Sequence, residues 1–214
     1  MENNSAIFNK SYDDLSKLYE ASYTKYVFVF DFDLTLTTKS SDGIVKSFSN
    51  YIELFDSELK LEKLMFYLQK IKKSGNIIYI NTRALVPNII HILKNVNIEV
   101  GENKLIKEIK GSTKIGQIDV PFNNEELNKY NLKTISDNKI LWGVKKVIYL
   151  NEIKENENIP ISNIFFFDDS IININTAKVN GYTNCFLIGS NDSGLFGLDF
   201  LLIKLSQILD ILHI

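Results

Sequence analysis

The sequence of 214 residues predicts a single α/β domain built on a doubly wound, mostly parallel β-sheet. Two observations predict this fold. Apolar strand-like runs alternate with amphipathic helical patterns, and three of the runs end directly in polar or acidic residues, where α/β proteins place their functional groups. The predicted strands lie near residues 26–31, 77–81, 105–109, 163–167 and 183–188. The predicted helices lie near residues 58–73, 85–95, 143–154 and 171–180.

The first strand is the most informative element. Residues 26–30 are all aromatic or β-branched, a composition typical of an interior parallel strand. Asp31-Phe32-Asp33 follows at once, so two carboxylates stand where a buried strand ends and a loop begins. Two negative charges at such a place need a cation or a bound ligand to balance them. The pair therefore predicts a metal site.

Later elements bring further polar groups to strand or helix ends. The second strand runs into Thr82, and the strand at 163–167 runs into the acidic pair Asp168-Asp169. Between them, Lys145 and Lys146 stand at the start of an amphipathic helix. Because the carboxyl ends of parallel strands share one edge of a sheet, we expect these groups to lie near the first acidic pair.

The two ends of the chain carry one predicted helix each, at residues 8–23 and 197–213, outside the motif-bearing core of residues 26–190. The last helix has leucine and isoleucine at near-heptad spacing. We expect this face to pack on the core, with contact to another chain or to a further domain as the alternative. The single cysteine, Cys185, stands in an apolar run and is expected to be a buried thiol.

The four motifs together resemble those of the haloacid dehalogenase-like (HAD) superfamily of phosphohydrolases. That family has an Asp-x-Asp-x-Thr loop, a strand ending in Thr or Ser, a Lys near a helix start and a strand ending in an acidic pair. The chain offers Asp31 to Thr35, Thr82, Lys146 and Asp168-Asp169 in this order. The resemblance implies a Rossmann-like sheet with the HAD-like fold, and a Mg²⁺-dependent phosphatase that forms an aspartyl-phosphate.

The resemblance also implies a role for each residue of the first loop and the second strand. Asp31 is expected to be the nucleophile, and Asp33 the general acid to the leaving oxygen and then the general base on the attacking water. Thr35 is expected to tie the backbone of the loop. Thr82 is expected to donate its hydroxyl and backbone N–H to a phosphoryl oxygen.

Two assignments concern the positive charges of the site. Lys146 is expected to bind the phosphate, because Tyr149 and Leu150 follow it at the spacing common in the family, and Lys145 is the alternative. The expected Mg²⁺ ligands are the carboxylates of Asp31 and Asp168 and the backbone carbonyl of Asp33. Asp169 is expected to support the site through water or the loop.

The lengths between motifs bear on the substrate. Family members that act on small metabolites usually carry a large cap, whereas here neither the gap after Thr35 nor the segment 116–138 leaves room for more than a minimal one. An open site suits a large surface, so we predict a phosphorylated protein or peptide as substrate, with phosphotyrosine favoured. The alternatives are a small-metabolite phosphomonoesterase and a catalytically idle HAD-like binding or targeting module.

Charge and hydropathy limit the other partners. The formal net charge of −2 argues against bulk attraction to nucleic acid, so no nucleic-acid partner is expected. No secretory signal opens the chain, and no apolar run reaches the length of a membrane span. We therefore expect a protein of the cytoplasm.

Overall fold

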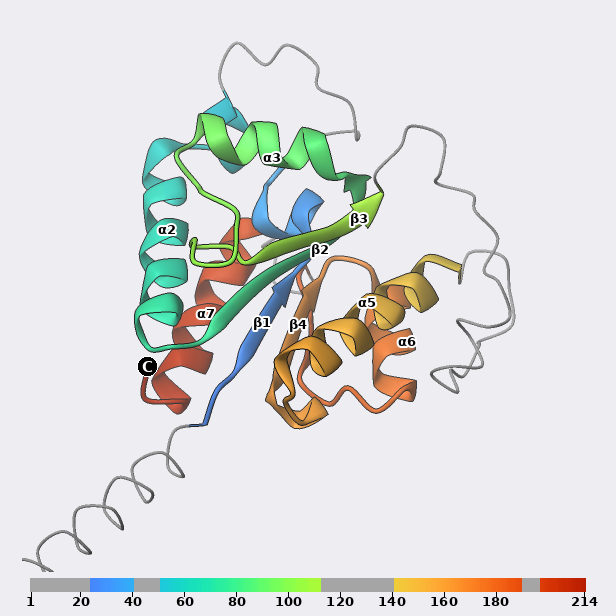
Figure 1. Cartoon of the computed structure of the whole chain (residues 1–214). Coiled ribbons are helices and arrows are strands. Elements are labelled where there is room, and N and C mark those ends of the chain that lie inside the picture. The colour runs from blue at the N-terminus through green and yellow to red at the C-terminus, as the bar shows by residue number, and fades with distance from the viewer. Residues whose placement is uncertain (1–23, 41–50, 113–140, 190–196) are drawn as a thin grey trace, which may run out of the picture.

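The computed structural model describes residues 24–40, 51–112, 141–189 and 197–214. Five strands form one sheet in the order β3-β2-β1-β4-β5, and every neighbouring pair is parallel. This confirms the predicted parallel α/β sheet (Figure 1). The strands are β1 (Val27–Phe30), β2 (Ile77–Leu85), β3 (Glu108–Ser112), β4 (Ile164–Asp168) and β5 (Cys185–Leu187).

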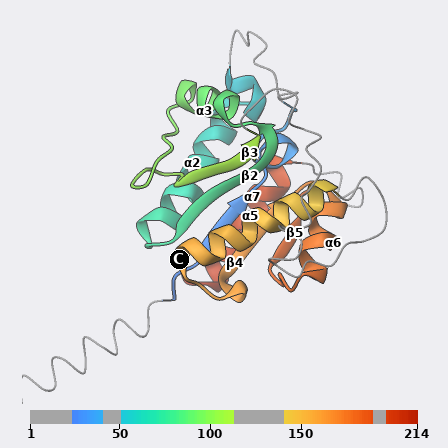
Figure 2. The same ribbon diagram turned by 45° about the vertical axis from the view of Figure 1, so that its right-hand side comes forward.

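Helices cover both faces of the sheet, as a doubly wound fold requires (Figures 1 and 2). One face carries α2 (Glu58–Lys73), α3 (Val86–Asn95) and α7 (Leu198–Ile211). The other face carries α5 (Leu141–Glu157) and α6 (Ile171–Val179), which lie side by side in front of the sheet in Figure 2. Three short helical turns complete the described elements: η1 (Phe32–Leu36), η2 (Tyr51–Phe55) and η5 (Ile161–Asn163).

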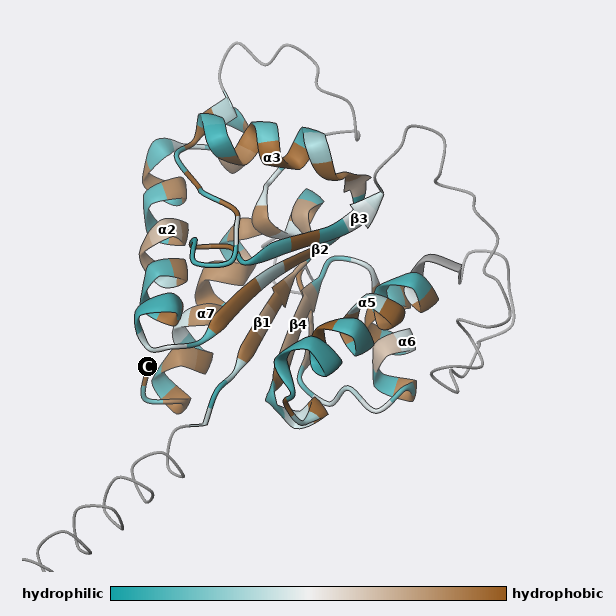
Figure 3. Cartoon of the chain, in the orientation of Figure 1, coloured by the Kyte–Doolittle hydropathy of each residue, from teal (hydrophilic) through white to brown (hydrophobic). Residues whose placement is uncertain are grey.

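The two-residue period of the strands divides the core into two layers. In β1, Phe28 and Phe30 pack toward α2, α3 and α7, whereas Val27 and Val29 pack toward α5 and α6. On the first face, phenylalanine rings of β1, β4 and β5 stack across the strands, and the ring centroids of Phe30 and Phe167 are 4.9 Å apart. Both faces of β1 are therefore buried, and Figure 3 shows apolar colour along the strands and polar colour on the outer sides of the helices.

The predicted boundaries hold within a few residues, except around β2 and β3. Strand β2 continues past the predicted end at residue 81 to Leu85, because its pairing with β3 resumes after an irregularity between Asn81 and Leu85. Strand β3 begins at Glu108, later than predicted, since Ile106 forms an isolated bridge with Val100 instead. The apolar pattern of residues 105–109 therefore marks a core segment that is only partly a strand.

The last predicted helix is α7, and its apolar face packs on the core. Its six buried residues are Leu198, Leu201, Leu202, Leu205, Ile208 and Leu209. Cys185 is buried, as expected. The predicted leading helix at 8–23 and the segment 116–138 lie outside the described residues. No helix in the described part of the chain has the length and apolar character needed to cross a lipid bilayer.

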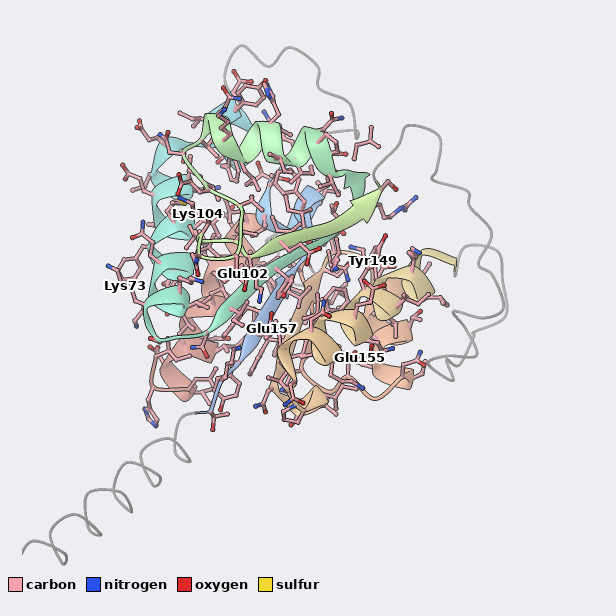
Figure 4. All side chains as sticks on the ribbon, viewed as in Figure 1. Lys73, Glu102, Lys104, Tyr149, Glu155 and Glu157 are labelled. Atoms are coloured by element: carbon pink, nitrogen blue, oxygen red, sulfur yellow. The ribbon has the colours of Figure 1, made fainter. Side chains whose placement is uncertain are left out.

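Helix α5 is held at its carboxyl end by a buried ion cluster around Glu157 (Figure 4). The Glu157 carboxylate accepts hydrogen bonds from Lys25 Nζ at 3.0 Å, from Lys107 Nζ at 2.7 Å and from the Tyr79 hydroxyl. Burial acts to raise the pKa of Glu157, but these three donors outweigh it and the pKa is lowered. The start of β1, the middle of β2 and the approach to β3 are thus tied to one end of α5.

Candidate active site

The acidic residues lie at the carboxyl ends of β1 and β4, the two strands in the middle of the sheet. The chain passes from β1 outward through β2 to β3, and then returns to place β4 on the other side of β1. This is the point at which the strand order changes direction, where α/β folds place their binding sites. The Asp31 amide donates to the Phe167 carbonyl at 2.8 Å, so Asp31 lies directly beside Asp168.

Lys146 joins these two strands to α5. Its Nζ donates to Asp31 Oδ1 at 2.6 Å, to Asp168 Oδ2 at 2.7 Å and to the Asn81 carbonyl at 2.7 Å. An ammonium group has three protons, so every donor of Lys146 is engaged. Burial acts to lower the pKa of Lys146, but Asp168 and Asp31 outweigh it and the pKa is raised. The lysine is therefore charged although only 2% of it is exposed.

The neighbouring lysine lies outside this cluster. Lys145 is partly exposed, and its Nζ is 5.3 Å from the centre of the Tyr149 ring, a cation–π distance. Of the two lysines that the sequence analysis leaves open, Lys146 is thus the one that contacts the acidic residues.

The two carboxylates of the second acidic pair have different surroundings. Asp168 is fully buried, and its Oδ1 accepts hydrogen bonds from the Ser170 amide and from Asn173 Nδ2, both at 2.9 Å. With Lys146 on Oδ2, both oxygens of Asp168 already have donors. Asp169 is only partly buried. Burial raises the pKa of Asp169, and the charge of Asp168 adds to this effect.

Asp31, Asp168 and Asp169 form a possible cation site. One carboxylate oxygen from each residue lies within 4.8 Å of the others. Burial raises the pKa of Asp31 to about 7, with Lys146 opposing the shift and Asp168 adding to it. When all three carboxylates are ionised, they and the one ammonium leave two negative charges in an almost buried space. Oxygen donors of this kind and a charge deficit of this size fit a hard divalent cation such as Mg²⁺.

The loop after Asp31 is a tight turn, η1, in which Leu34 has a φ of 59°. The hydroxyl that ties this turn belongs to Thr37, which accepts a hydrogen bond from the Leu34 amide at 3.2 Å and lies 3.2 Å from the Phe32 carbonyl. Thr35, expected to tie the loop, is buried, and among the described residues its hydroxyl has no hydrogen-bond partner. Asp33 lies in the same turn and is partly exposed.

Thr82 follows Asn81 on β2 and is buried beside the cluster. Its hydroxyl oxygen accepts a hydrogen bond from the Ala84 amide at 3.1 Å, which leaves the hydroxyl proton available to a ligand. Strand β3 approaches closely here, because a Cβ atom on Gly111 would lie 3.0 Å from the Thr82 carbonyl. The position of Thr82 is thus set by the irregular part of β2 rather than by a strand end.

Two further side chains hold the cluster and were not anticipated. Asn81 donates from Nδ2 to the Lys146 carbonyl at 3.0 Å, so it contacts both ends of that lysine. Asn173 holds Asp168. A signal for Asn81 existed, since it continues the inward series of Ile77 and Tyr79 as a polar residue. No such signal marks Asn173 in the sequence, because asparagine is common throughout this chain.

Neither a protein-family model nor a curated protein sequence matches the chain. Solved structures with a similar arrangement include a haloacid dehalogenase-like family hydrolase from Streptococcus pneumoniae, with a TM-score of 0.48 and 13% identity over 88% of this chain and 98% of that one. They also include the HAD domain of the effector protein Lem4 from Legionella pneumophila, with a TM-score of 0.48 and 15% identity over 87% of this chain and 92% of that one. At this level of similarity, the activity has to be argued from the residues of the site itself.

Proposed function

We propose that the chain is a Mg²⁺-dependent phosphatase that works through an aspartyl-phosphate, and that it belongs with the HAD-like phosphatases. The observation that carries the proposal is the buried cluster at the ends of β1 and β4, in which Asp31, Asp168 and Asp169 face one fully engaged lysine. A binding module has no need for this number of buried charges, and perturbed groups gathered in this way are typical of catalytic sites.

The proposed reaction has two displacements. An oxygen of Asp31 attacks phosphorus, the bond from phosphorus to the ester oxygen breaks, and Asp33 gives its proton to the leaving alcohol or phenol. Water then attacks the aspartyl-phosphate, Asp33 takes a proton from it, and inorganic phosphate leaves. A phosphate ester is negatively charged and repels an anionic nucleophile. The residues of the site therefore have to bring positive charge to the phosphoryl group that is transferred.

Lys146 has a defined part in this sequence. In the resting site its three protons are engaged by Asp31, Asp168 and Asn81. When Asp31 becomes an acyl phosphate, its carboxylate loses its negative charge. The Lys146 proton that this carboxylate accepted then becomes available to a phosphoryl oxygen. Thr82 offers a second donor, its hydroxyl. Lys146 thus stabilises the nucleophile before the first displacement and the intermediate after it.

The donor set suggests which carboxylates would hold Mg²⁺. The sequence predicts Asp168 as a direct ligand and Asp169 as a support. Both oxygens of Asp168 accept hydrogen bonds from other groups, whereas Asp169 is the less buried of the pair. We therefore assign direct coordination to Asp31 and Asp169, together with the predicted Asp33 carbonyl. Asp168 would instead hold Lys146. When bound, Mg²⁺ supplies charge to neutralise the phosphoryl oxygens.

Magnesium binding is expected to weaken as the pH falls. Because the pKa of Asp31 is raised to about 7 without the cation, the carboxyl must lose its proton before it can bind metal. Affinity should therefore be constant well above pH 7 and fall by about tenfold for each pH unit below it. Calorimetric titration with Mg²⁺ from pH 5.5 to 8.5 measures this. Asp31→Asn should remove most of the pH dependence, and an affinity that stays constant down to pH 5.5 would contradict the assignment.

The substrate class is the second part of the proposal. We propose a phosphorylated protein or peptide, with phosphotyrosine favoured, because the two places where a cap would be inserted are short. These places are residues 41–50 and 113–140, which lie outside the described part of the chain. Their aromatic residues, Phe48, Phe122 and Tyr130, are the ones that we propose for contact with a phosphotyrosine ring. Phe55, at the spacing of Phe48 and Tyr51 on one helical side, is fully buried in the core and cannot contact a substrate. Tyr51 is partly exposed, and its hydroxyl lies 2.9 Å from His91 Nε2.

One assay series tests both parts. Hydrolysis of an aryl phosphate should require Mg²⁺ and stop with EDTA, and no hydrolysis under any metal would favour the idle binding module. In a panel at equal Mg²⁺, phosphotyrosine peptides should show a higher kcat/KM than sugar phosphates or nucleoside monophosphates, because surfaces around an open site supply the selectivity. A small metabolite that wins by orders of magnitude would instead support the metabolite phosphatase.

A further inference from the structure

A groove runs between α2 and α7 on the outer side of the molecule, away from the acidic cluster. It has a volume of roughly 710 Å³, and its lining includes five apolar residues: Leu59, Phe66, Tyr67, Leu202 and Ile203. Polar residues at its sides include Asp199, which forms an ion pair with Lys60 at 2.8 Å. We call this the α2–α7 groove.

Three of the five apolar residues that line the groove are unusually exposed. Leu59 is 59% exposed, Phe66 60% and Ile203 45%, although the outer side of a helix that covers a sheet is normally polar. Single exposed apolar residues need no explanation, but three that line one hollow mark a surface that another segment covers.

The position of the groove points to a segment of this chain. The lining residues advance together, from Leu59 and Asp199 to Tyr67 and Gln207, so α2 and α7 run in the same direction. Both helices end near the amino-terminal ends of the strands, where the chain enters β1 (Figure 1). The Tyr26 ring packs edge-to-face on Phe165 at 5.6 Å, and it belongs to the core layer beneath α2 and α7. The described part of the chain therefore begins at the end of the sheet where both helices of the groove end, with Tyr26 on the side of the groove and Lys25 on the side of α5.

The leading segment has a pattern that fits such a hollow. Phe8, Tyr12, Leu15 and Tyr19 are spaced by four, three and four residues, which places them on one side of a helix. The opposite side of residues 8–19 carries four charged residues: Lys10, Asp13, Asp14 and Lys17. An isolated amphipathic helix of this length is marginal in water and needs a surface to pack on.

We propose that residues 8–19 fold back as a helix into the α2–α7 groove, with their four apolar side chains on Leu59, Phe66 and Ile203. A helix of this length spans about 18 Å. Residues 20–25, when extended, can reach about 20 Å. The start of β1 and a helix in the groove are separated by the layer of α2 and α7, and two packing distances of about 10 Å each give the same length. A tether this short gives an effective concentration in the millimolar range, which favours the leading segment over a second copy of the chain at micromolar concentration.

The test is hydrogen exchange of the full chain, read at residues 59–67 and 199–207. Replacing Phe8, Tyr12, Leu15 and Tyr19 together by serine should speed exchange at residues 59–67 and 199–207 by about tenfold. This factor is the ratio of a millimolar effective concentration to a dissociation constant of roughly 100 μM. The matched control replaces Lys10, Asp13, Asp14 and Lys17 by serine, which leaves the net charge unchanged and alters only the opposite side of the helix. Exchange in this control should equal that of the wild type.

A reciprocal variant and a dilution series complete the test. Phe66→Ser with Ile203→Ser should speed exchange within residues 8–19, while exchange in β1 and β4 stays unchanged because both replaced side chains are exposed. Protection of the groove should be the same at 1 and 100 μM protein. Equal exchange in both leading-segment variants would overturn the proposal, as would protection that appears only at the higher concentration together with dimers in sedimentation. None of these readouts depends on phosphatase activity.

Discussion

Replacing Asp31 by asparagine is expected to lower the turnover of an aryl phosphate by at least about a thousandfold, because the variant has no nucleophile to form the covalent intermediate. Asparagine keeps an oxygen that can accept the hydrogen bond from Lys146, so the local contacts persist. Steady-state kinetics at saturating Mg²⁺ measures the loss. Turnover within tenfold of the wild type would exclude the aspartyl-phosphate mechanism.

A measurement of stability should distinguish this loss of activity from misfolding of the variant. Because the pKa of Asp31 is raised in the folded protein, the folded state binds a proton more tightly than the unfolded state does, and stability from this group is lost as the pH rises through about 7. Asp31→Asn has no such charge to bury. The Mg²⁺-free variant should therefore be at least as resistant to urea as the Mg²⁺-free wild type at pH 8. Asp33→Asn is the companion variant, expected to slow both displacements and leave the fold intact.

Replacing Lys146 by methionine is expected to reduce both activity and stability. Its Nζ balances the buried carboxylates of Asp31 and Asp168, and removal of one partner from a buried ion pair typically costs about 3–5 kcal/mol. Loss of a positive charge from the transferring group should also lower kcat by roughly a hundredfold to a thousandfold. Urea unfolding with and without Mg²⁺, combined with kinetics on the folded fraction, separates the two effects.

Lys145→Met is the matched control, one residue away on the same helix. Lys145 is partly exposed and contacts the Tyr149 ring, so its replacement should change the unfolding free energy by less than about 1 kcal/mol and leave kcat near that of the wild type. If Lys145→Met were the inactive variant, the phosphate-binding role would belong to Lys145.

The sequence predicts most of this site because buried charges are expensive and therefore conspicuous. Asp31 follows an apolar strand and Asp168 ends one, and strands that are otherwise apolar belong in the middle of a parallel sheet. Neighbouring strands in one sheet then bring the two residues together, as the Asp31 to Phe167 hydrogen bond shows. Such inferences need only local pattern and topology.

The allocation of donors among these groups could not be predicted. Whether Asp168 or Asp169 faces the cation depends on where Lys146 and Asn173 place their protons, and these contacts join α5 and α6 to β4. The tie from Thr37 to the turn after Asp31 likewise depends on a φ of 59° at Leu34, which leucine rarely adopts. The irregular pairing of β2 with β3 was missed for the same reason, since it is set by the close approach of Gly111.

The central place of β1 also bears on how the protein is made. This strand leaves the ribosome before either of its neighbours, and both its edges can hydrogen-bond to another chain until β2 and β4 arrive. Lys146 follows Asp31 by 115 residues, which takes roughly 6 to 23 seconds at ordinary rates of synthesis. The edge of β1 that pairs with β4 stays open for at least that time, and an apolar strand with an open edge is prone to aggregate, so yield from rapid expression should depend on chaperones and temperature. The proposed active site can form only after β4 has joined the sheet, because Asp168 belongs to that strand.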